Sequence, residues 1–513
     1  MCGVVLLAGP SALNRIPECL QRLQHRGPDA VDVWQQEALA IGFARLAIND
    51  LSPAGGQPYR YGDFVSAVNG EIFNSSELRA RYQLDVPSSN DCHVIPALLH
   101  QLGINAVTEL DGFFAGIVYD QREHQLYCLR DGMGKKPLFV GRSGSELFVS
   151  SELKALDRVD EFSALPSGLS RLDLISGELN LLVDTDLLDT DLVALDSSAS
   201  GCSQKRFPGS VSNTDKQAQL GQLLTQAVTK RLPEVTQPLG VFVSGGLDSS
   251  IIAALIHQQR RDVVYYTLTS GSAEDGHYVQ CLADHLGLPE LRSVSLPDEA
   301  ELDHLIRTLV YTTESFNPSI ISNGLCTYLL ARAARQDGLK VVLSGEGADE
   351  LFGGYHHFLP DGPWRETRLQ LLTDLSQTEL RRVDLTGMAH GIETRCPFMD
   401  RDLINWALQL GYDDLYHRSE DEKLNKWILR QVASGYLPDE IVWRRKMSCD
   451  VGSGMRKLVV EHLRKHCSSE RDALKAIWQA AFADKYPALD DRPYFSAYPV
   501  FDALIDRRGV EHK

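Results

Sequence analysis

One stretch near the middle of the chain limits the fold more than any other. Leu239–Val243 is an apolar run, Ser244-Gly245-Gly246 follows as a turn, and Ile251–Ile256 has the composition of a buried helix. This order predicts a buried parallel strand that leads through a glycine turn into a helix. Because the free N–H groups and the dipole of such a helix attract negative charge, the stretch predicts an anion site in an α/β sheet.

The residues at this turn favour phosphate as the anion. Glycines let phosphate oxygens approach the backbone, and the hydroxyls of Ser244, Ser249 and Ser250 can donate hydrogen bonds. Asp248 can contact phosphate only through a cation, so we assign it to Mg²⁺. The stretch lacks the lysine of the GxxxxGK[ST] loop. An ordinary turn of a Rossmann-like sheet is the alternative.

The second half of the chain alternates strands and helices, which predicts a doubly wound parallel sheet. The expected strands are Val263–Leu268, Ser293–Leu296 and Lys340–Leu343, and the expected helices are Lys216–Lys230, Asp275–Leu286, Glu299–Thr312 and Leu325–Asp337. A second glycine turn, Ser344–Tyr355, carries acidic residues. The two turns should meet at the carboxyl ends of the strands, with Asp349 sharing the metal with Asp248. Glu346 is the candidate for contacting the acceptor or the attacking amine; an acidic surface loop is the alternative.

The first half predicts a sheet-rich α+β domain. Short apolar runs recur at Ala40–Ile48, Val65–Val68, Phe113–Tyr119, Leu126–Leu129 and Leu147–Val149, and helical spacing appears at Arg15–Gln24 and Asp91–Leu102. Cys2 becomes the first residue if Met1 is removed. Its thiol then lies beside an α-amino group of pKa about 7.7–8.0, which can act as its general base. A cysteine that merely happens to be second is the alternative.

Each half of the chain resembles a known family, and the whole chain resembles a third. SGGLDSS at 244–250 resembles the pyrophosphate motif of the ATP pyrophosphatases. The first half resembles the class II, N-terminal-nucleophile glutamine amidotransferases in MCG at 1–3, HRGPD at 25–29, AVNGEIFN at 67–74 and NDCHVI at 90–95. The whole chain resembles the glutamine-hydrolysing asparagine synthetases, in which HGIETRCPFMD at 390–400 and WRRK at 443–446 also recur.

The resemblance implies a role for each matching residue. Cys2 attacks the glutamine amide, Asn69 and Gly70 form the oxyanion hole, and Lys446 stabilises the pyrophosphate or the developing negative charge. The glutamine-binding residues would be Arg45, Asn69, Gly70, Glu71 and Asp91, with Arg45 on the α-carboxylate and Asp91 on the ammonium. The ATP-binding residues would be Phe242, Ser244, Gly245, Gly246, Leu247, Asp248, Ser249, Ser250, Leu268, Ser344 and Gly345.

Taken singly, these residues have other readings. Arg45 and Lys446 would be surface charges, Asp91 a helix N-cap and Asn69-Gly70 a hairpin turn. Glu393 is interpreted as a structural residue paired with an arginine. His93 stands where the amidotransferase family more often has glutamate.

The implied architecture is an αββα N-terminal-nucleophile hydrolase sandwich at 2–190, a linker at 191–214 and an α/β Rossmann-like ATP-pyrophosphatase domain at 215–513. Glutamine would be hydrolysed in the first domain, and ammonia would pass through a tunnel to an acyl-adenylate in the second. The products would be an amide, AMP and pyrophosphate, with ATP and Mg²⁺ as cofactors.

One segment departs from the resemblance. A Thr-Thr-Ile-Arg-type run of the family is replaced between Glu314 and Tyr328, and Ser322 stands at the arginine position. The departure indicates that the acceptor can be something other than aspartate, and the expected acceptor is a carboxylate, either aspartate or a related amino acid. A β-lactam synthetase of a tabtoxin-type antibiotic pathway, which closes a ring by intramolecular attack on an acyl-adenylate, remains an alternative. A non-catalytic scaffold is a third.

Composition limits the partners and the compartment. The formal net charge of −18 disfavours nucleic acid as a partner, and the chain has no apolar run long enough for a membrane span. The N-terminus lacks the basic region of a signal peptide. Ten cysteines without a CxxC pair indicate reduced thiols in a cytoplasmic protein. The expected partners are small molecules, and the resemblance allows a homodimer.

Overall fold

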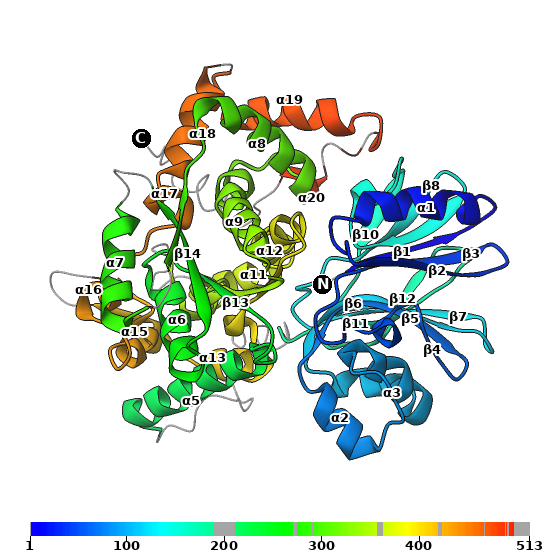
Figure 1. Cartoon of the computed structure of the whole chain (residues 1–513), viewed down its shortest axis with the longest axis horizontal. Coiled ribbons are helices and arrows are strands. Elements are labelled where there is room, and N and C mark those ends of the chain that lie inside the picture. The colour runs from blue at the N-terminus through cyan, green and yellow to red at the C-terminus, as the bar shows by residue number, and fades with distance from the viewer. Residues whose placement is uncertain are drawn as a thin grey trace.

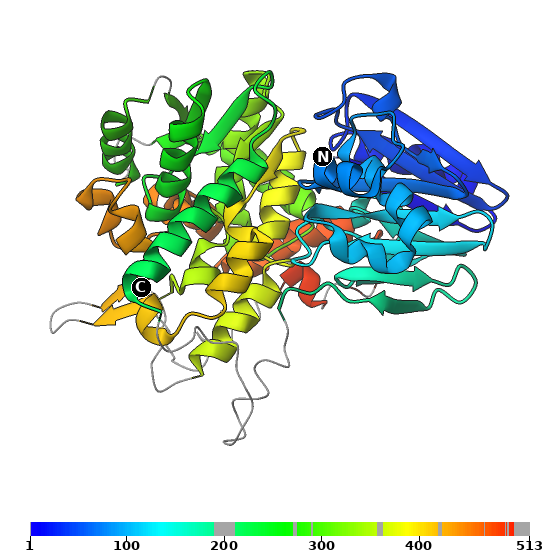
Figure 2. The ribbon, with the colours of Figure 1, turned by 90° about the horizontal axis from the view of Figure 1, so that it is seen from below.

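The computed structural model describes residues 2–188, 211–269, 274–288, 291–355, 363–418, 423–465, 467–487, 489 and 492–496. They form two lobes that lie side by side, with the start of β1 at the boundary between them (Figure 1). The view from below shows the same separation, with the blue and cyan strands of the first lobe against the green and yellow helices of the second (Figure 2). No helix among the described residues has the length and apolar character needed to cross a membrane.

The first lobe contains two antiparallel sheets of six strands each. One sheet has the spatial order β10 (Glu161–Ala164), β8 (Phe139–Ser143), β9 (Glu146–Ser150), β1 (Gly3–Ala8), β3 (Leu39–Arg45) and β2 (Ala30–Gln36). The other has the order β12 (Leu179–Val183), β11 (Gly168–Leu172), β7 (Gln125–Arg130), β6 (Gly112–Asp120), β5 (Phe64–Ile72) and β4 (Tyr59–Tyr61). Helix α1 (Ala12–Leu23) covers the first sheet, and α2 (Ser75–Tyr82) and α3 (Val94–Leu102) cover the second (Figure 1).

Strand alternation explains the four layers. In β1, Val4 and Leu6 point into the core between the two sheets, whereas Val5 and Leu7 pack with α1. A strand buried on both faces has apolar residues at every position, as Gly3–Ala8 does. The prediction of a sheet-rich domain is confirmed, although β1 itself was not among the predicted strands.

The second lobe is built around a parallel five-stranded sheet. Its order is β15 (Leu291–Ser295), β14 (Val263–Thr269), β13 (Leu239–Phe242), β16 (Val341–Leu343) and β17 (Glu393–Arg395). The helices are α5 (Asn213–Arg231), α6 (Leu247–Gln259), α7 (Asp275–Leu286), α8 (Glu299–Thr313), α9 (Pro318–Gln336), α10 (Ala348–Phe352), α11 (Trp364–Asp374), α12 (Glu379–Met388), α13 (Arg401–Ala407), α14 (Tyr412–Leu415), α15 (Trp427–Ala433), α16 (Asp439–Val442), α17 (Cys449–Gly452), α18 (Met455–Arg464), α19 (Glu470–Phe482) and α20 (Pro493–Ser496). A hairpin joins β18 (Tyr416–Arg418) and β19 (Lys423–Asn425).

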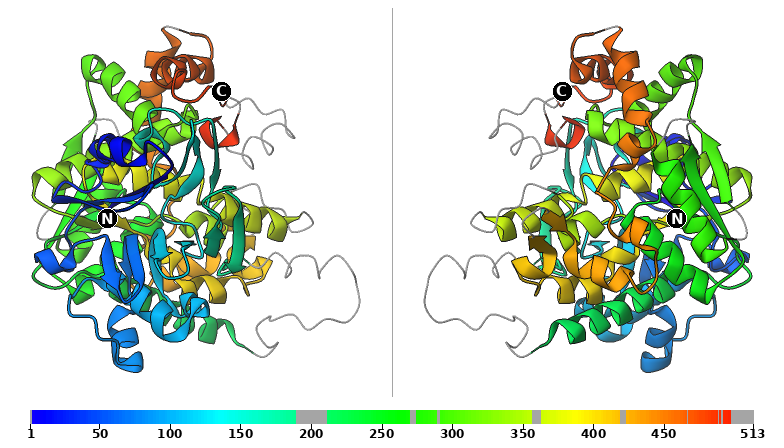
Figure 3. Two further views of the ribbon diagram at one scale, coloured as in Figure 1. Left: turned by 90° about the vertical axis from the view of Figure 1, so that its right-hand side faces the viewer. Right: turned by 90° about the vertical axis from the view of Figure 1, so that its left-hand side faces the viewer.

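The sheet order identifies where a ligand can bind. Strand β13 pairs in parallel with β14, the next strand in the chain, on one side and with β16 on its other side. The order in which strands are added to the sheet therefore reverses at β13. In open parallel sheets such a reversal leaves a crevice at the carboxyl ends of the strands. Two views turned by 90° from Figure 1 show helices of the C-terminal region, coloured orange to red, at the top of the molecule (Figure 3).

Some predicted boundaries are wrong for physical reasons. Helix α9 begins at Pro318, well before Leu325, because the side chain of Asn317 accepts hydrogen bonds from the first turn. The segment from Asp91 starts as a 3₁₀ turn before α3. Residues 189–210, which include most of the predicted linker, lie outside the described residues.

Buried ion pairs join the two lobes. Arg26 of the HRGPD segment bonds Glu152 at 2.6 Å in its own lobe and Asp384 of α12 at 2.8 Å in the other. A second pair between the lobes, Lys340 with Asp29 at 2.7 Å, is partly exposed. Because removing one partner of a buried pair leaves an uncompensated charge, these contacts hold the lobes in a defined orientation.

Candidate active sites

The first site lies at the start of β1. Its small pocket, about 30 Å³ in volume, is lined by Cys2, Phe43, Arg45, Leu46, Ala47, Ile48, Asn49, Asp50, Gln57, Val68, Gly70, Glu71, Asn90, Asp91, Cys92 and Glu393. Several of the residues predicted to bind glutamine therefore gather around one thiol.

Cys2 is held by contacts on three sides. Its backbone N–H donates to Oδ1 of Asn69 at 2.7 Å, and its carbonyl accepts from Nε of Arg26 at 2.9 Å. The N–H of Leu46 lies 3.4 Å from Sγ. Burial raises the pKa of the Cys2 thiol, so a base is needed to generate a thiolate.

Asn69 lies next to Cys2 and carries a buried side-chain donor. It lies inside β5, which excludes the hairpin-turn alternative, and its Nδ2 is buried without a hydrogen-bond partner in the described part of the chain. A buried donor without a partner is costly unless a ligand accepts from it. Gly70 follows in the same strand, and a Cβ there would meet the carbonyl oxygen of Phe113 at 2.3 Å, so only glycine fits.

Arg45 and two carboxylates surround the thiol. Arg45 is anchored by donating to the carbonyls of Ser52, at 2.9 Å, and of Asp50. Asp91 accepts from the Ile72 N–H at 2.6 Å, and Asn49 donates to both Asp91 and Glu71. The surface-charge alternative for Arg45 is excluded, because this side chain is buried beside the pocket.

The second lobe contributes directly to this site. Glu393 of β17 lines the small pocket, and Arg395 bonds Glu71 at 3.0 Å and Glu393 at 2.6 Å. The predicted arginine partner of Glu393 is thus Arg395. Burial raises the pKa of Glu71 to about 8, against the lowering effect of Arg395. The small pocket is complete only when both lobes are present.

His93 does not line the small pocket. Its ring stacks on Tyr59 with 3.6 Å between centroids, and its nitrogens bond Ser88 and the carbonyl of Gly56. Burial lowers the pKa of His93 to about 3, so the ring is neutral. The histidine therefore supports the loop around the pocket.

The two glycine corners of the second lobe touch. Strands β13 and β16 are neighbours, and a Cβ on Gly345 would meet the backbone of Asp248 and Ser249 at 2.8 Å. Gly245 has φ +67°, a conformation that favours glycine. The predicted meeting of the two corners is confirmed, and neither corner is an isolated surface loop.

Asp248 and Asp349 face the same point. Lys426 donates to Asp248 at 2.6 and 2.7 Å and lies 2.6 Å from Asp349. Lys446 bonds Asp349 at 2.5 Å and lies 3.6 Å from Asp248, so it is not a surface lysine. Burial raises the pKa of Asp349, but the two ammonium groups lower it to about 2. Both carboxylates therefore face the same two cationic groups.

The donor set at this point suits Mg²⁺ bound to nucleotide phosphates. Mg²⁺ prefers oxygen ligands and is commonly bound by one or two carboxylates plus phosphate oxygens. Asp248 and Asp349 would hold the ion, and Lys426 and Lys446 would then be available to phosphate. No cluster of three or more metal-binding side chains occurs among the described residues, so phosphate oxygens and water would supply the other ligands.

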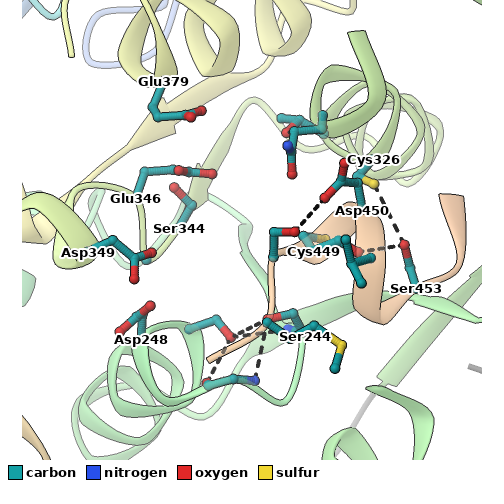
Figure 4. A pocket seen from close by; sticks show the side chains of 18 of the residues that line it. Ser244, Asp248, Cys326, Ser344, Glu346, Asp349, Glu379, Cys449, Asp450 and Ser453 are labelled. Atoms are coloured by element: carbon teal, nitrogen blue, oxygen red, sulfur yellow. Dashed lines mark hydrogen bonds between the residues drawn. The ribbon is translucent and has the colours of Figure 1, made fainter. Parts of the chain in front are cut away.

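A large pocket of about 740 Å³ opens above the two corners (Figure 4). Of the predicted ATP-binding residues, those that line it are Phe242, Ser244, Gly246, Leu247, Asp248, Ser249, Leu268, Ser344 and Gly345. Gly245 and Ser250 are not among its lining residues, and Ser250 is fully buried. Ser249 receives a hydrogen bond from the Ser244 N–H at 3.1 Å, which shapes the turn.

The end of the large pocket around Glu346 is polar. Arg382 bonds Glu346 and Glu379, each at 2.8 Å, and donates to Thr327 at 2.8 Å. Figure 4 shows Glu346 and Asp349 on one wall and Asp450 on the opposite wall. Sequence reasoning missed Lys426, Arg382 and Asp450, which belong to no recognised motif. Arg382 and Asp450 lie in α12 and α17, and Lys426 directly precedes α15.

Comparison with known proteins identifies the family of each half of the chain. Residues 1–171 match a family model described as a glutamine amidotransferase domain, and residues 219–373 and 361–497 match one described as asparagine synthase. The glutamine-hydrolysing asparagine synthetase B of Escherichia coli (strain K12) is 31% identical over 460 residues, covering 85% of this chain and 79% of that protein. The glutamine-hydrolysing asparagine synthetase 1 of Saccharomyces cerevisiae is 30% identical over 575 residues, covering 99% and 94%.

These features define a class in which an N-terminal-nucleophile glutamine amidotransferase domain precedes an ATP-pyrophosphatase domain with a parallel sheet. Within that class, the chain belongs to the asparagine synthase family.

Proposed function

We propose that this protein is an ATP-dependent ligase that forms an amide with ammonia taken from glutamine. Cys2 hydrolyses glutamine, and the ammonia attacks an acyl-adenylate of an amino-acid acceptor, aspartate or a relative of it. AMP and pyrophosphate are the other products. The observation that carries the proposal is the contact of the two glycine corners, which brings Asp248 and Asp349 onto one ammonium group.

The small pocket supports the glutaminase half. Arg45 offers a planar guanidinium to the glutamine α-carboxylate, and Asp91 offers a carboxylate to its ammonium. Asn69 Nδ2 is a donor that would lie ready for the oxyanion of the tetrahedral intermediate, with the Gly70 N–H as the second proposed donor.

The large pocket supports the ligase half. Phe242 and Leu268 offer an apolar surface for adenine, and the Ser244 and Ser344 corners offer donors to phosphate. Lys446 would stabilise the leaving pyrophosphate, and Glu346 would contact the acceptor or the attacking ammonia. Mg²⁺ would neutralise phosphate charge at Asp248 and Asp349.

One assay series tests the proposal. Pyrophosphate release is measured with ATP, Mg²⁺, glutamine and a panel of carboxylic acids that begins with aspartate. Acceptor-dependent release together with glutamate formation would support it. Product formation with neither glutamine nor ammonia would instead identify lactam closure, and absence of ATP turnover with every acid would contradict both.

Asn69→Asp is expected to lower the kcat of glutamine hydrolysis by about 10²–10³-fold, because it replaces an oxyanion donor with an acceptor of the same shape. The measurement is glutamate formation under saturating glutamine. Ammonia-dependent pyrophosphate release serves as the control and should keep its rate. A glutaminase kcat within about threefold of the wild type would show that Asn69 is not an oxyanion donor.

A further inference from the structure

Two cysteine thiols lie close together in the wall of the large pocket. Cys326 belongs to α9 and Cys449 begins α17, and these two helices pack against each other. Both residues line the pocket and both are free thiols. Figure 4 shows them on the wall opposite Glu346, beside Asp450 and Ser453. The ligase half therefore carries a pair of thiols inside its own cavity.

A short set of contacts fixes the two thiols in neighbouring positions. Sγ of Cys326 lies 3.8 Å from Oγ of Ser453 and donates to the carbonyl of Ser322 at 3.6 Å. The same Ser453 hydroxyl donates to the carbonyl of Cys449 at 2.6 Å. One hydroxyl thus contacts both cysteines, and the side chain of Cys449 lies within hydrogen-bonding range of the Cys326 thiol.

The two thiols differ in their access to the cavity. Cys326 is 1% exposed, whereas Cys449 is partly exposed. Burial raises the pKa of Cys326 well above its ordinary value, and the neighbouring Cys449 thiol raises it further. Because the thiolate is the nucleophile, an oxidant that enters the pocket is expected to react first with Cys449. Cys326 is then placed to react second.

We propose that Cys326 and Cys449 form a peroxide-sensitive dithiol that closes to a disulfide and lowers the activity of the ligase half. The Cys449 thiolate attacks one oxygen of hydrogen peroxide, the O–O bond breaks, and the departing hydroxide takes up a proton to leave as water. The Cys326 thiol attacks the resulting sulfenic acid, which forms the S–S bond, breaks the S–O bond and releases a second water. Peroxide is reduced by two electrons, and two thiols are oxidised to one disulfide.

The position of the pair predicts the consequence of the disulfide. Ser322, one turn before Cys326, donates to Asp450 at 2.5 Å, and Asp450 directly follows Cys449. Because an S–S bond of about 2.05 Å is shorter than a contact between two thiols, its formation would draw α17 toward α9 and shift this part of the pocket wall. Displacements of about 1 Å can cost about 10²-fold in rate, so we expect ligase activity to fall by about 10- to 100-fold. This effect rests on the proposed ligase function, whereas formation of the disulfide does not.

The test treats the purified full chain with hydrogen peroxide. Ammonia-dependent pyrophosphate release is the measured activity, so that oxidation of Cys2 in the small pocket does not enter the result. The rate should fall by about 10- to 100-fold, and dithiothreitol should restore it. Mass spectrometry of peptides digested without reductant should show Cys326 joined to Cys449. The peptide measurement needs no enzymatic activity.

Two variants and a control assign the effect to the pair. In each protein, the rate after peroxide is divided by its own rate under dithiothreitol, so differences in basal activity cancel. Cys449→Ser removes the thiol that reacts first and should abolish the reversible inhibition. Cys326→Ser leaves Cys449 without a resolving thiol, so prolonged peroxide should carry it to the sulfinic acid, which dithiothreitol does not reverse. Cys281→Ser is the matched control, because Cys281 is a partly exposed cysteine of α7 that does not line the large pocket, and this variant should keep the wild-type response.

The outcomes separate the inference from the function beneath it. If peroxide yields no peptide that joins Cys326 to Cys449, or if the disulfide forms and pyrophosphate release keeps its rate, the inference is wrong while the ligase function stands. Wild-type reversible inhibition in Cys449→Ser would assign the effect to another thiol and would also overturn the inference. If the reduced wild type releases no pyrophosphate with any acid, the proposed function fails and the claim about activity fails with it, while the peptide measurement still decides the disulfide.

Discussion

Cys2→Ala is expected to lower glutamine hydrolysis by about 10⁴-fold or more, because it removes the thiol that we propose as the nucleophile. Ammonia-dependent pyrophosphate release should survive, since Cys2 lies in the small pocket and does not line the large one. The measurement pairs glutamate formation with pyrophosphate release when ammonium chloride replaces glutamine.

Cys19→Ala is a matched control for this experiment. Cys19 is a buried cysteine of the same lobe, on α1 and away from the small pocket, and its replacement should leave both activities intact. Glutamine hydrolysis at the wild-type rate in Cys2→Ala would remove Cys2 from the mechanism. Loss of both activities would indicate that the substitution disturbs the boundary between the lobes, where Arg26 bonds the Cys2 carbonyl.

The sequence predicted those parts of the fold that depend on local pattern. Helix α7 has the predicted bounds, and β13, the glycine turn and α6 follow one another as expected. Apolar runs and glycine turns are short-range signals, and parallel strands impose the meeting of Asp248 with Asp349 through topology alone.

Residues whose position depends on long-range packing could not be predicted. Lys426 has φ +54° at the start of α15 and reaches Asp248 across 178 positions of sequence. Strand β17 has three residues, too few for a periodic signal, and it pairs only because β16 lies beside it. Asp450 lies in a four-residue helix that no capping motif announces.

Strand β17 also shows how the two sites are related. Glu393 lines the small pocket, whereas Thr394, the next residue, lines the large one. Successive side chains of a strand point to opposite faces, so the backbone of this one strand lies between the two cavities at this point. The composition of β17 therefore affects both sites at once, which no motif of either domain reveals.

Asp349→Asn is expected to lower pyrophosphate release by about 10³-fold, because it removes one carboxylate from the proposed metal site and one partner of two buried ammonium groups. Glutamine hydrolysis should continue, since Asp349 does not line the small pocket. The measurement is acceptor-dependent pyrophosphate release over a range of Mg²⁺ concentrations. Asp303→Asn, which alters a surface pair with Arg307, is the control and should have no effect.

The Mg²⁺ titration separates two explanations for that loss. If Asp349 holds the metal, the variant should need a higher Mg²⁺ concentration for half-maximal release, and excess Mg²⁺ should restore part of the rate. If Asp349 only neutralises Lys426, the double variant Asp349→Asn/Lys426→Met should regain activity and the Mg²⁺ requirement should stay unchanged. Wild-type pyrophosphate release in Asp349→Asn would contradict both, and with them the idea that the two glycine corners jointly hold a magnesium–triphosphate.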